Sequence, residues 1–206
     1  MQESGTPTHS TDRRTIAILV VDVQQDFCAG GALAVPGGDQ IVPVLNALLA
    51  RAGALGMACY ATRDWHPSHS NHFRPRGPWP VHCVAGTPGA QFHHDLRLPT
   101  GTVIVNKGVR SDSNGYTAFE PGLDDDTDLS VDAARRSITH FVAAGLATDY
   151  CVRASVLDAL RRGFEVTLLA DAIAAVDTTP GDGQRALEEM RAAGAVIAAT
   201  VGVPLE

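Results

Sequence analysis

One cysteine of this sequence lies where a nucleophile could be activated by its surroundings. Cys151 follows an apolar stretch that ends near Ala144, and Thr148 and Asp149 just before it are good helix N-cap residues. The sequence therefore predicts a strand, a short turn and a helix with Cys151 in its first turn. Unpaired backbone N–H groups and the helix dipole at such a position favour the thiolate, which is the nucleophilic form. The opposing interpretation, a small buried apolar residue, fits this stretch about equally well.

Two further polar residues lie at the ends of predicted strands. Asp22 is near the end of the apolar run Thr15 to Val23, and Lys107 follows the run Gly101 to Asn106. Because the carboxyl ends of parallel strands share one edge of a sheet, we expect Asp22, Lys107 and Cys151 to converge. A thiolate could then attack, a carboxylate could transfer a proton, and an ammonium could stabilise both anions. Taken singly, Lys107 is more commonly a solvated surface amine, and Asp22 could cap a turn.

A cluster of histidines follows the second predicted strand. Asp64 and His66 are two residues apart, so they face the same side of an extended chain. The long loop after them can bring His72 and His82 back to the same place, whereas His69 is expected to face outward. Neutral imidazoles and one carboxylate suit zinc, iron or manganese. The opposing interpretation is a polar loop with incidental histidines.

The cysteines allow one alternative arrangement. His82 stands beside Cys83, which leaves open a papain-like pair of a thiol and an imidazole. No two cysteines are close enough in sequence to form a CxxC motif, so in a reducing compartment all four are expected to be free thiols. These cysteines are Cys28, Cys59, Cys83 and Cys151.

The elements that must position these residues alternate between apolar runs and helical patterns. This alternation predicts an α/β fold with three layers, a mostly parallel six-stranded sheet with helices on both faces. Strands are expected at Thr15–Val23, Met57–Arg63, Gly101–Asn106, His140–Ala144, Glu165–Ala170 and Ala195–Thr200. Helices are expected at Asp39–Leu55, within Asp124–Arg136, from Cys151 to Arg162, and at Gly181–Ala193. Residues 1–14 are expected to be a flexible tail, and residues 15–206 a single domain.

Composition narrows the classes of protein. The 206 residues carry a formal net charge of -7, which disfavours binding to nucleic acid or to an anionic membrane. No apolar run is long enough to span a bilayer, and the polar N-terminus lacks the apolar core of a signal peptide. We therefore expect a cytoplasmic protein.

Five ordered segments resemble one known family. They are VDVQQDFCAGGALAV at residues 21–35, TRDWHPSHSNHF at 62–73, WPVHCVAGTPGAQFH at 79–93, NKG at 106–108 and GLATDYCVRASVLDA at 145–159. Through them the chain resembles the nicotinamidases of the isochorismatase-like hydrolase family from Thr15 to Thr200. The segments around Asp22 and Cys151 are shared by the whole family, while the histidine-containing segments point to the nicotinamidase branch.

The resemblance assigns a catalytic role to the three converging residues. It implies Asp22 as general base and acid, Lys107 as the third member of a triad, and Cys151 as the nucleophile. The backbone amides of Ala147 and Cys151 would form the oxyanion hole, with a cis peptide bond between Leu146 and Ala147. One divalent ion, with zinc preferred over iron or manganese, would be held by Asp64, His66, His72 and His82.

The same resemblance implies a substrate and a pocket. Nicotinamide would be hydrolysed to nicotinate and ammonia through a thioester, and pyrazinamide to pyrazinoate in the same way. Phe27 and Trp79 would sandwich the pyridine ring, Tyr116 would close the pocket, and Ala147 would line it. The segment from Gly108 to Tyr116 is slightly longer than is usual in the family, which bears on the assignment of Tyr116.

Two other functions are compatible with parts of the pattern. A related hydrolase could act on another small amide or ureido compound of the carbamoyl or maleamate type, and would not need the histidine loop. A non-catalytic metal-binding or thiol-sensing domain would place Asp22 and Lys107 far from Cys151. The expected partner in the enzymatic case is a small molecule, and the chain could be a monomer or a homo-oligomer.

Overall fold

The sheet has six strands, and every pairing between them is parallel in the computed structural model, which describes residues 15–120 and 129–205. The order across the sheet is β3-β2-β1-β4-β5-β6. The strands are β1 (Ile16–Val21), β2 (Ala58–Asp64), β3 (Val103–Lys107), β4 (His140–Leu146), β5 (Glu165–Ala174) and β6 (Val196–Ala198). This arrangement confirms the predicted α/β class and the expected number of strands.

Strand β1 lies in the middle of the sheet because its side chains are apolar on both faces. It pairs with β2 from Ala17 opposite Ala58, and with β4 from Ile16 opposite His140. All but its first residue are buried. A continuous apolar run of this kind is stable only between two covered faces.

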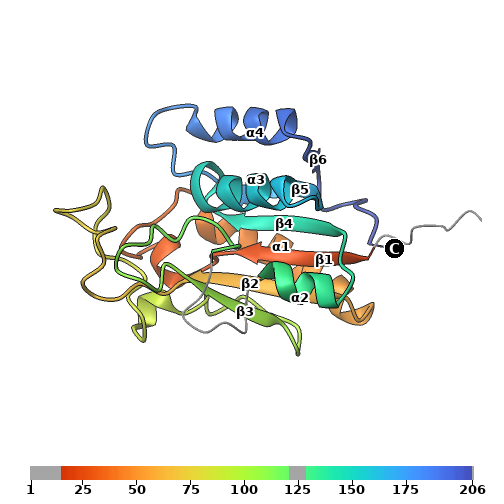
Figure 1. Ribbon diagram of the computed structural model, residues 1–206, viewed down its shortest axis with the longest axis horizontal. Helices are drawn as coiled ribbons and strands as arrows, with labels where there is room; N and C mark the ends of the chain where they lie inside the picture. Colours follow the sequence, from red (N-terminus) through yellow and green to blue (C-terminus); the bar gives the residue numbers. More distant parts are fainter. Residues whose placement is uncertain (1–14, 121–128, 206) are drawn as a thin grey trace, which may run out of the picture.

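Helices cover both faces and make three layers (Figure 1). On one face α1 (Val42–Ala54) packs Leu45, Leu48 and Leu49 against Ile18 and Val20 of β1. On the other face α2 (Leu129–Arg135), α3 (Arg153–Arg161) and α4 (Asp182–Ala192) pack against the alternate residues of the strands. The three-layer prediction is therefore confirmed.

The elements differ from the sequence-based boundaries at a few places. Strand β5 continues to Ala174, and β6 is only three residues long. Cys151 lies in a π-helical turn, Thr148–Val152, that precedes α3. The expected tail at residues 1–14 and the first part of the Asp124–Arg136 segment fall outside the described residues.

One glycine permits the close approach of β4 to β1 just before this turn. Gly145 has a φ of 124°, and a Cβ atom there would collide with the backbone of Val21. The β4–β5 register also shifts between Ala143 and Gly145. The end of β4 therefore lies directly beside the end of β1, which Asp22 follows.

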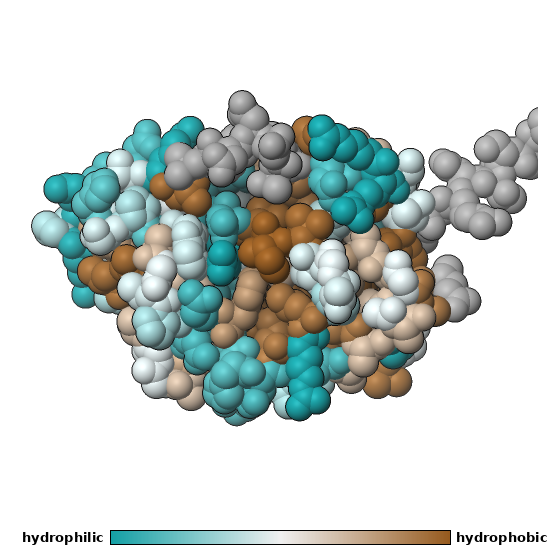
Figure 2. All heavy atoms as spheres, turned by 90° about the horizontal axis from the view of Figure 1, so that it is seen from below, coloured by the Kyte–Doolittle hydropathy of each residue, from teal (hydrophilic) through white to brown (hydrophobic). Residues whose placement is uncertain are grey.

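The surface on the β3 side combines polar and apolar side chains. Figure 2 views the molecule from this side, and apolar side chains gather in the middle of the face. None of the helices in residues 15–120 and 129–205 is both long enough and apolar enough to cross a membrane.

Candidate active site

The polar residues that end the strands meet at the carboxyl edge of the sheet. Asp22 follows β1 directly, Asp64 is the last residue of β2, and Lys107 is the last residue of β3. Asp64 and Lys107 are partners in the β2–β3 register, so they lie side by side. Cys151 reaches the same edge through the π-helical turn after β4. The loops that follow β2 and β3 gather at this end of the molecule (Figure 1).

Lys107 is the centre of the site. Its side chain is fully buried, so the alternative of a solvated surface amine is wrong. Its Nζ atom lies 2.6 Å from Asp22 Oδ2, 2.6 Å from Asp64 Oδ1 and 3.4 Å from Cys151 Sγ. It also donates a hydrogen bond of 2.5 Å to the carbonyl of Gly115. Burial alone would lower the pKa of Lys107, but the two carboxylates raise it well above its ordinary value, so Lys107 is an ammonium.

Asp22 has the properties of a proton-transfer group. It is fully buried, its φ of 49° is unusual for a residue with a side chain, and its Oδ1 accepts a 2.6 Å hydrogen bond from Thr62 Oγ1. Burial raises the pKa of Asp22 to about 6, with Lys107 opposing the rise and the charge of Asp64 adding to it. A carboxyl group with this pKa can both accept and donate a proton near neutral pH.

Cys151 is in contact with this pair, but its resting state differs from the expectation. Burial raises the pKa of its thiol well above the ordinary value, Lys107 lowers it, and the carboxylates of Asp22 and Asp64 raise it further. These effects outweigh the helix end that favours a thiolate. Cys151 therefore rests as a thiol beside Asp22, and a role as nucleophile would require that its proton be removed.

Three histidines and Asp64 form a second cluster directly beside the first. One ring nitrogen from each of His66, His72 and His82 lies within 4.8 Å of the others. Asp64 Oδ2 is 3.6 Å from His66 Nε2 and 4.0 Å from His82 Nε2. His69 is exposed, as expected.

The hydrogen bonds of these histidines fit a metal ion. His66 Nδ1 lies 3.0 Å from the carbonyl of Gly108, and His82 Nδ1 lies 2.8 Å from that of Pro80. Each of these Nδ1 atoms must carry the proton to bond a carbonyl, which leaves both Nε2 atoms with free lone pairs. His66 Nε2 and His72 Nδ1 are buried atoms without a hydrogen-bond partner in the described part of the chain.

The protonation of the cluster agrees with this reading. Burial lowers the pKa of His72 to about 4 and also lowers that of His82, so both rings are neutral at pH 7. Burial alone would raise the pKa of Asp64, but the charge of Lys107 and its hydrogen bond to Asp64 hold this pKa below its ordinary range. Neutral imidazoles and an ionised carboxylate are the ligands of zinc and similar ions.

A pocket opens above both clusters. Phe27, Trp79, Tyr116 and Ala147, the four residues expected to bind substrate, all line it together with Cys151. Trp79 Nε1 donates a 3.0 Å hydrogen bond to the hydroxyl of Tyr116, so the longer segment before Tyr116 does not carry this residue away. The peptide bond between Leu146 and Ala147 is cis, as the resemblance implied.

The sequence model of a protein family, described as the isochorismatase domain, matches residues 16–201 of the chain. The chain belongs to the isochorismatase family. This match includes the ends of all six strands and every residue of both clusters, so the converging groups described above are those of an isochorismatase-family domain.

Several members of this family are similar over nearly their whole length. The nicotinamidase of Escherichia coli (strain K12) is 38% identical over 198 residues, covering 88% of this chain and 93% of that protein. A solved structure of a pyrazinamidase of Pyrococcus horikoshii in complex with zinc is 45% identical, covers 90% of this chain and 99% of the other, and has a TM-score of 0.83. PnC1 from L. infantum in complex with nicotinate is 33% identical, covers 91% and 93% of the two chains, and has a TM-score of 0.80.

Four pocket residues of this isochorismatase-family chain were not predicted as such. Leu33, Val35, Tyr150 and Val176 also line the pocket. The first two lie within the quoted glycine-rich segment, and Tyr150 directly precedes Cys151, so their positions offered some signal. Val176 follows β5, and only the three-dimensional structure brings it to the site.

The alternative of a papain-like pair does not fit the geometry. His82 directs Nδ1 to Pro80 and has Nε2 near Asp64, as described above. The thiol of Cys83 instead contacts the carbonyl of Gly89 at 4.0 Å, and burial raises the pKa of this thiol well above its ordinary value. All four cysteines are free and buried.

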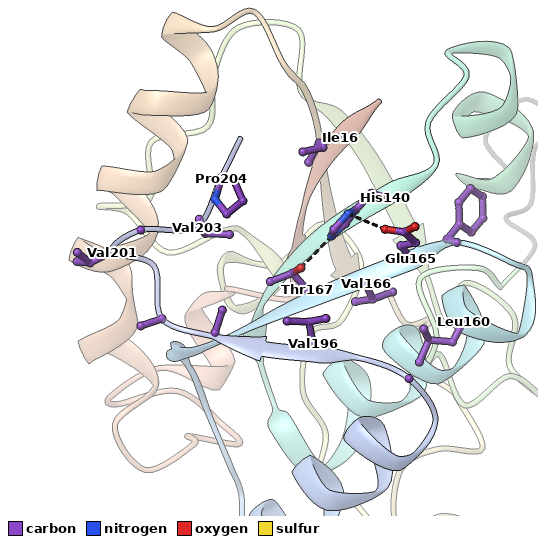
Figure 3. A pocket seen from close by; sticks show the side chains of 15 residues that line it. Ile16, His140, Leu160, Glu165, Val166, Thr167, Val196, Val201, Val203 and Pro204 are labelled. Atoms are coloured by element: carbon purple, nitrogen blue, oxygen red, sulfur yellow. Dashed lines mark hydrogen bonds and ion pairs between the residues drawn. The ribbon is translucent and has the colours of Figure 1, made fainter. Parts of the chain in front are cut away.

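A larger hollow lies at the opposite end of the sheet, beside the amino ends of the strands (Figure 3). His140 points there toward Thr167 and Glu165, at 2.9 Å from Thr167 Oγ1 and 3.4 Å from Glu165 Oε2. The other lining side chains are mostly apolar. Ligands of open parallel sheets bind at the carboxyl ends of the strands, so the chemistry of this family member belongs to the smaller pocket.

Proposed function

We propose that this chain is a nicotinamidase, which hydrolyses nicotinamide to nicotinate and ammonia and also hydrolyses pyrazinamide to pyrazinoate. The observation that supports this most directly is the contact between a buried ammonium and three groups, Asp22, Asp64 and Cys151, under an aromatic pocket. A thiol, a carboxyl group of raised pKa and an ammonium are the parts that amide hydrolysis through a thioester requires. The choice of nicotinamide and pyrazinamide as substrates is based on the relatives named above.

Acylation begins at Cys151. Its sulfur attacks the carbon of the carboxamide while Asp22 accepts the thiol proton, and Lys107 stabilises the negative charge on both groups. The carbonyl oxygen becomes an oxyanion, which the backbone N–H groups of Ala147 and Cys151 hold. The C–N bond then breaks as Asp22 donates its proton to the leaving nitrogen, which departs as ammonia.

Deacylation uses the same groups with water as the nucleophile. Asp22, ionised again, takes a proton from a water molecule that attacks the thioester carbonyl. The C–S bond breaks, the sulfur regains its proton from Asp22, and nicotinic acid is released, which loses its own proton to the solvent and becomes nicotinate. Each residue thus returns to its starting state after one water has been consumed.

The remaining residues bind and orient the substrate. Phe27 and Trp79 would hold the pyridine ring between them, and Tyr116 would close the pocket over it. Asp64, His66, His72 and His82 would hold one divalent ion, with zinc preferred. When bound, the ion supplies an electrophilic site for the nitrogen of the ring.

The test is ammonia release by the purified zinc-loaded protein. We expect turnover of nicotinamide and pyrazinamide, with nicotinate or pyrazinoate formed in equal amount, and no turnover by Cys151→Ala. Maleamate and an N-carbamoyl amine serve as competing substrates. A protein that hydrolysed these and left nicotinamide untouched would be a hydrolase of the second kind considered above.

We also infer a cytoplasmic location and a single domain over residues 15–206, on the composition and pattern of the sequence. The chain would work as a monomer or a homo-oligomer. Fractionation of the host cell and the molecular mass in solution test these two statements.

A further inference from the structure

A buried glutamine, Gln24, holds the backbone of one of the proposed metal ligands. Gln24 is fully buried, and a buried amide must find partners for its donors and its acceptor. Its Nε2 donates to the carbonyls of Asp64 and Ala90, both at 2.9 Å. Its Oε1 accepts the backbone N–H of Asp64 at 2.7 Å. The side chain thus binds both backbone polar groups of Asp64.

The hydrogen bonds of Gln24 to Asp64 replace the backbone bonds between β1 and β2 at the point where β1 ends. The β1–β2 ladder runs to Val20 opposite Ala61 and is followed by the bond from Asp22 N to the carbonyl of Thr62, at 3.2 Å. Beyond this point the β1 backbone turns away, and the amide of Gln24 replaces it. On the other side Asp64 remains paired with β3. Gln24 therefore provides the fixed contact on one of the two flanks of Asp64.

The position of Asp64 matters because its two carboxylate oxygens face different groups. Oδ1 binds Lys107 at 2.6 Å, and Oδ2 faces the histidines. A small shift of the Asp64 backbone would change both sets of distances together, since neither oxygen can compensate for the other.

We propose that Gln24 is a positioning residue that, through Asp64, sets the metal affinity of the site and the placement of the Lys107 ammonium. This inference rests on the proposed function in taking Asp64 as a metal ligand and, for the kcat readout alone, in taking nicotinamide as the substrate. Residues that hold metal ligands from outside typically change metal affinity or activity by about 10–100-fold when they are replaced.

The variant for the test is Gln24→Met, which keeps the length of the side chain and removes its donors and acceptor. The matched control is Gln25→Ala. Gln25 is the next residue, is only partly buried, and its amide makes one long bond of 3.5 Å to the carbonyl of Phe92. Gln24→Glu, which keeps the acceptor for the Asp64 N–H and replaces the donor, gives a second measurement where Gln24→Met does not fold.

The main readout is the dissociation constant of zinc, measured on the full chain by competition with a chromophoric chelator. We expect it to rise by about 10–100-fold in Gln24→Met or Gln24→Glu and to stay unchanged in Gln25→Ala. A second readout is kcat for nicotinamide at saturating zinc, which we expect to fall in the Gln24 variants because Lys107 is displaced with Asp64.

Two results separate this role from a merely structural one. A Gln24 variant with a lower unfolding temperature but wild-type zinc affinity and kcat would overturn the proposal. A wild-type protein that binds zinc but does not hydrolyse nicotinamide would instead count against the proposed function, and leaves the zinc comparison valid.

Discussion

The raised pKa of Asp22 predicts how activity depends on pH. Burial raises this pKa from the ordinary value of 3.8 to about 6, although Lys107 opposes the rise. In the proposed mechanism Asp22 must be ionised to accept the proton of Cys151, so kcat/KM should follow its ionised fraction in the free enzyme. Activity should therefore rise with pH and level off about one unit above this pKa.

The expected change is large enough to measure. With a pKa of about 6, roughly nine-tenths of Asp22 is ionised at pH 7 and about one-tenth at pH 5, so kcat/KM falls about tenfold between them. An aspartate of ordinary pKa would stay about nine-tenths ionised at pH 5, and kcat/KM would hardly change. Asp22→Asn, which cannot accept the proton, should lose roughly 10²–10⁴-fold at every pH.

The same pKa shift has the opposite effect on stability: activity rises with pH, whereas the free energy of unfolding falls. A carboxyl group with a higher pKa in the folded state favours folding below pH 3.8, and this advantage is lost as pH rises through about 6. Because one pKa unit corresponds to about 1.4 kcal/mol, the free energy of unfolding should fall by roughly 3 kcal/mol across this window. Asp22→Asn removes this loss, so its stability relative to the wild type should increase from pH 4 to pH 7.

The assay is the initial rate of ammonia release at nicotinamide concentrations well below KM, from pH 5 to 8. Urea unfolding of the wild type and of Asp22→Asn is measured over pH 4 to 7. His72, whose pKa burial lowers to about 4, stays neutral through the activity range, and bound zinc is measured at each pH as a control. A flat kcat/KM from pH 5 to 7 with zinc retained, or a midpoint near 4, would refute the raised pKa of Asp22, and wild-type activity in Asp22→Asn would refute Asp22 as the base.

Four other perturbations follow from the site and the core. Cys151→Ala should abolish ammonia release and leave the chain folded, which circular dichroism checks. Chelation should raise KM and lower the unfolding temperature, with both restored by zinc; an apoenzyme of unchanged KM would exclude a role for the ion in binding. Tyr116→Phe removes the acceptor of the Trp79 N–H, so KM should rise about threefold to tenfold at unchanged kcat. Leu48→Ala, in the fully buried face of α1, should lower the free energy of unfolding by about 2–5 kcal/mol in urea without changing KM.

The fold could be predicted from the sequence because the central strand β1 consists only of apolar residues. The run that becomes β1 is apolar on both faces, and only a covered parallel sheet accommodates such a run. The same reasoning placed Asp22 and Lys107 at strand ends, and parallel topology then brought them together. The boundaries of β5 and β6 were less accurate, because the end of a strand depends on pairing with its neighbour more than on its own residues.

The electrostatics of Cys151 could not be read in the same way. Its sequence neighbours describe a helix end, which favours a thiolate. The groups that reverse this preference are burial and the carboxylates of Asp22 and Asp64, which come from other strands. Gln24 is a similar case, because its partners Asp64 and Ala90 are 40 and 66 residues away, and nothing local marks a glutamine that will be buried.

The arrangement around Lys107 also gives a reason for a divalent ion beside the proposed triad. Two buried carboxylates, Asp22 and Asp64, share one ammonium, so their full ionisation leaves one negative charge uncompensated in the interior of the protein. That excess adds to the raised pKa of Asp22, but burial is the larger cause of the rise, and it acts with or without an ion. A cation held by Asp64 and three neutral imidazoles would supply the missing positive charge. The ion thus serves both the pocket and the buried charges beneath it, which is why its removal should lower substrate affinity and stability together.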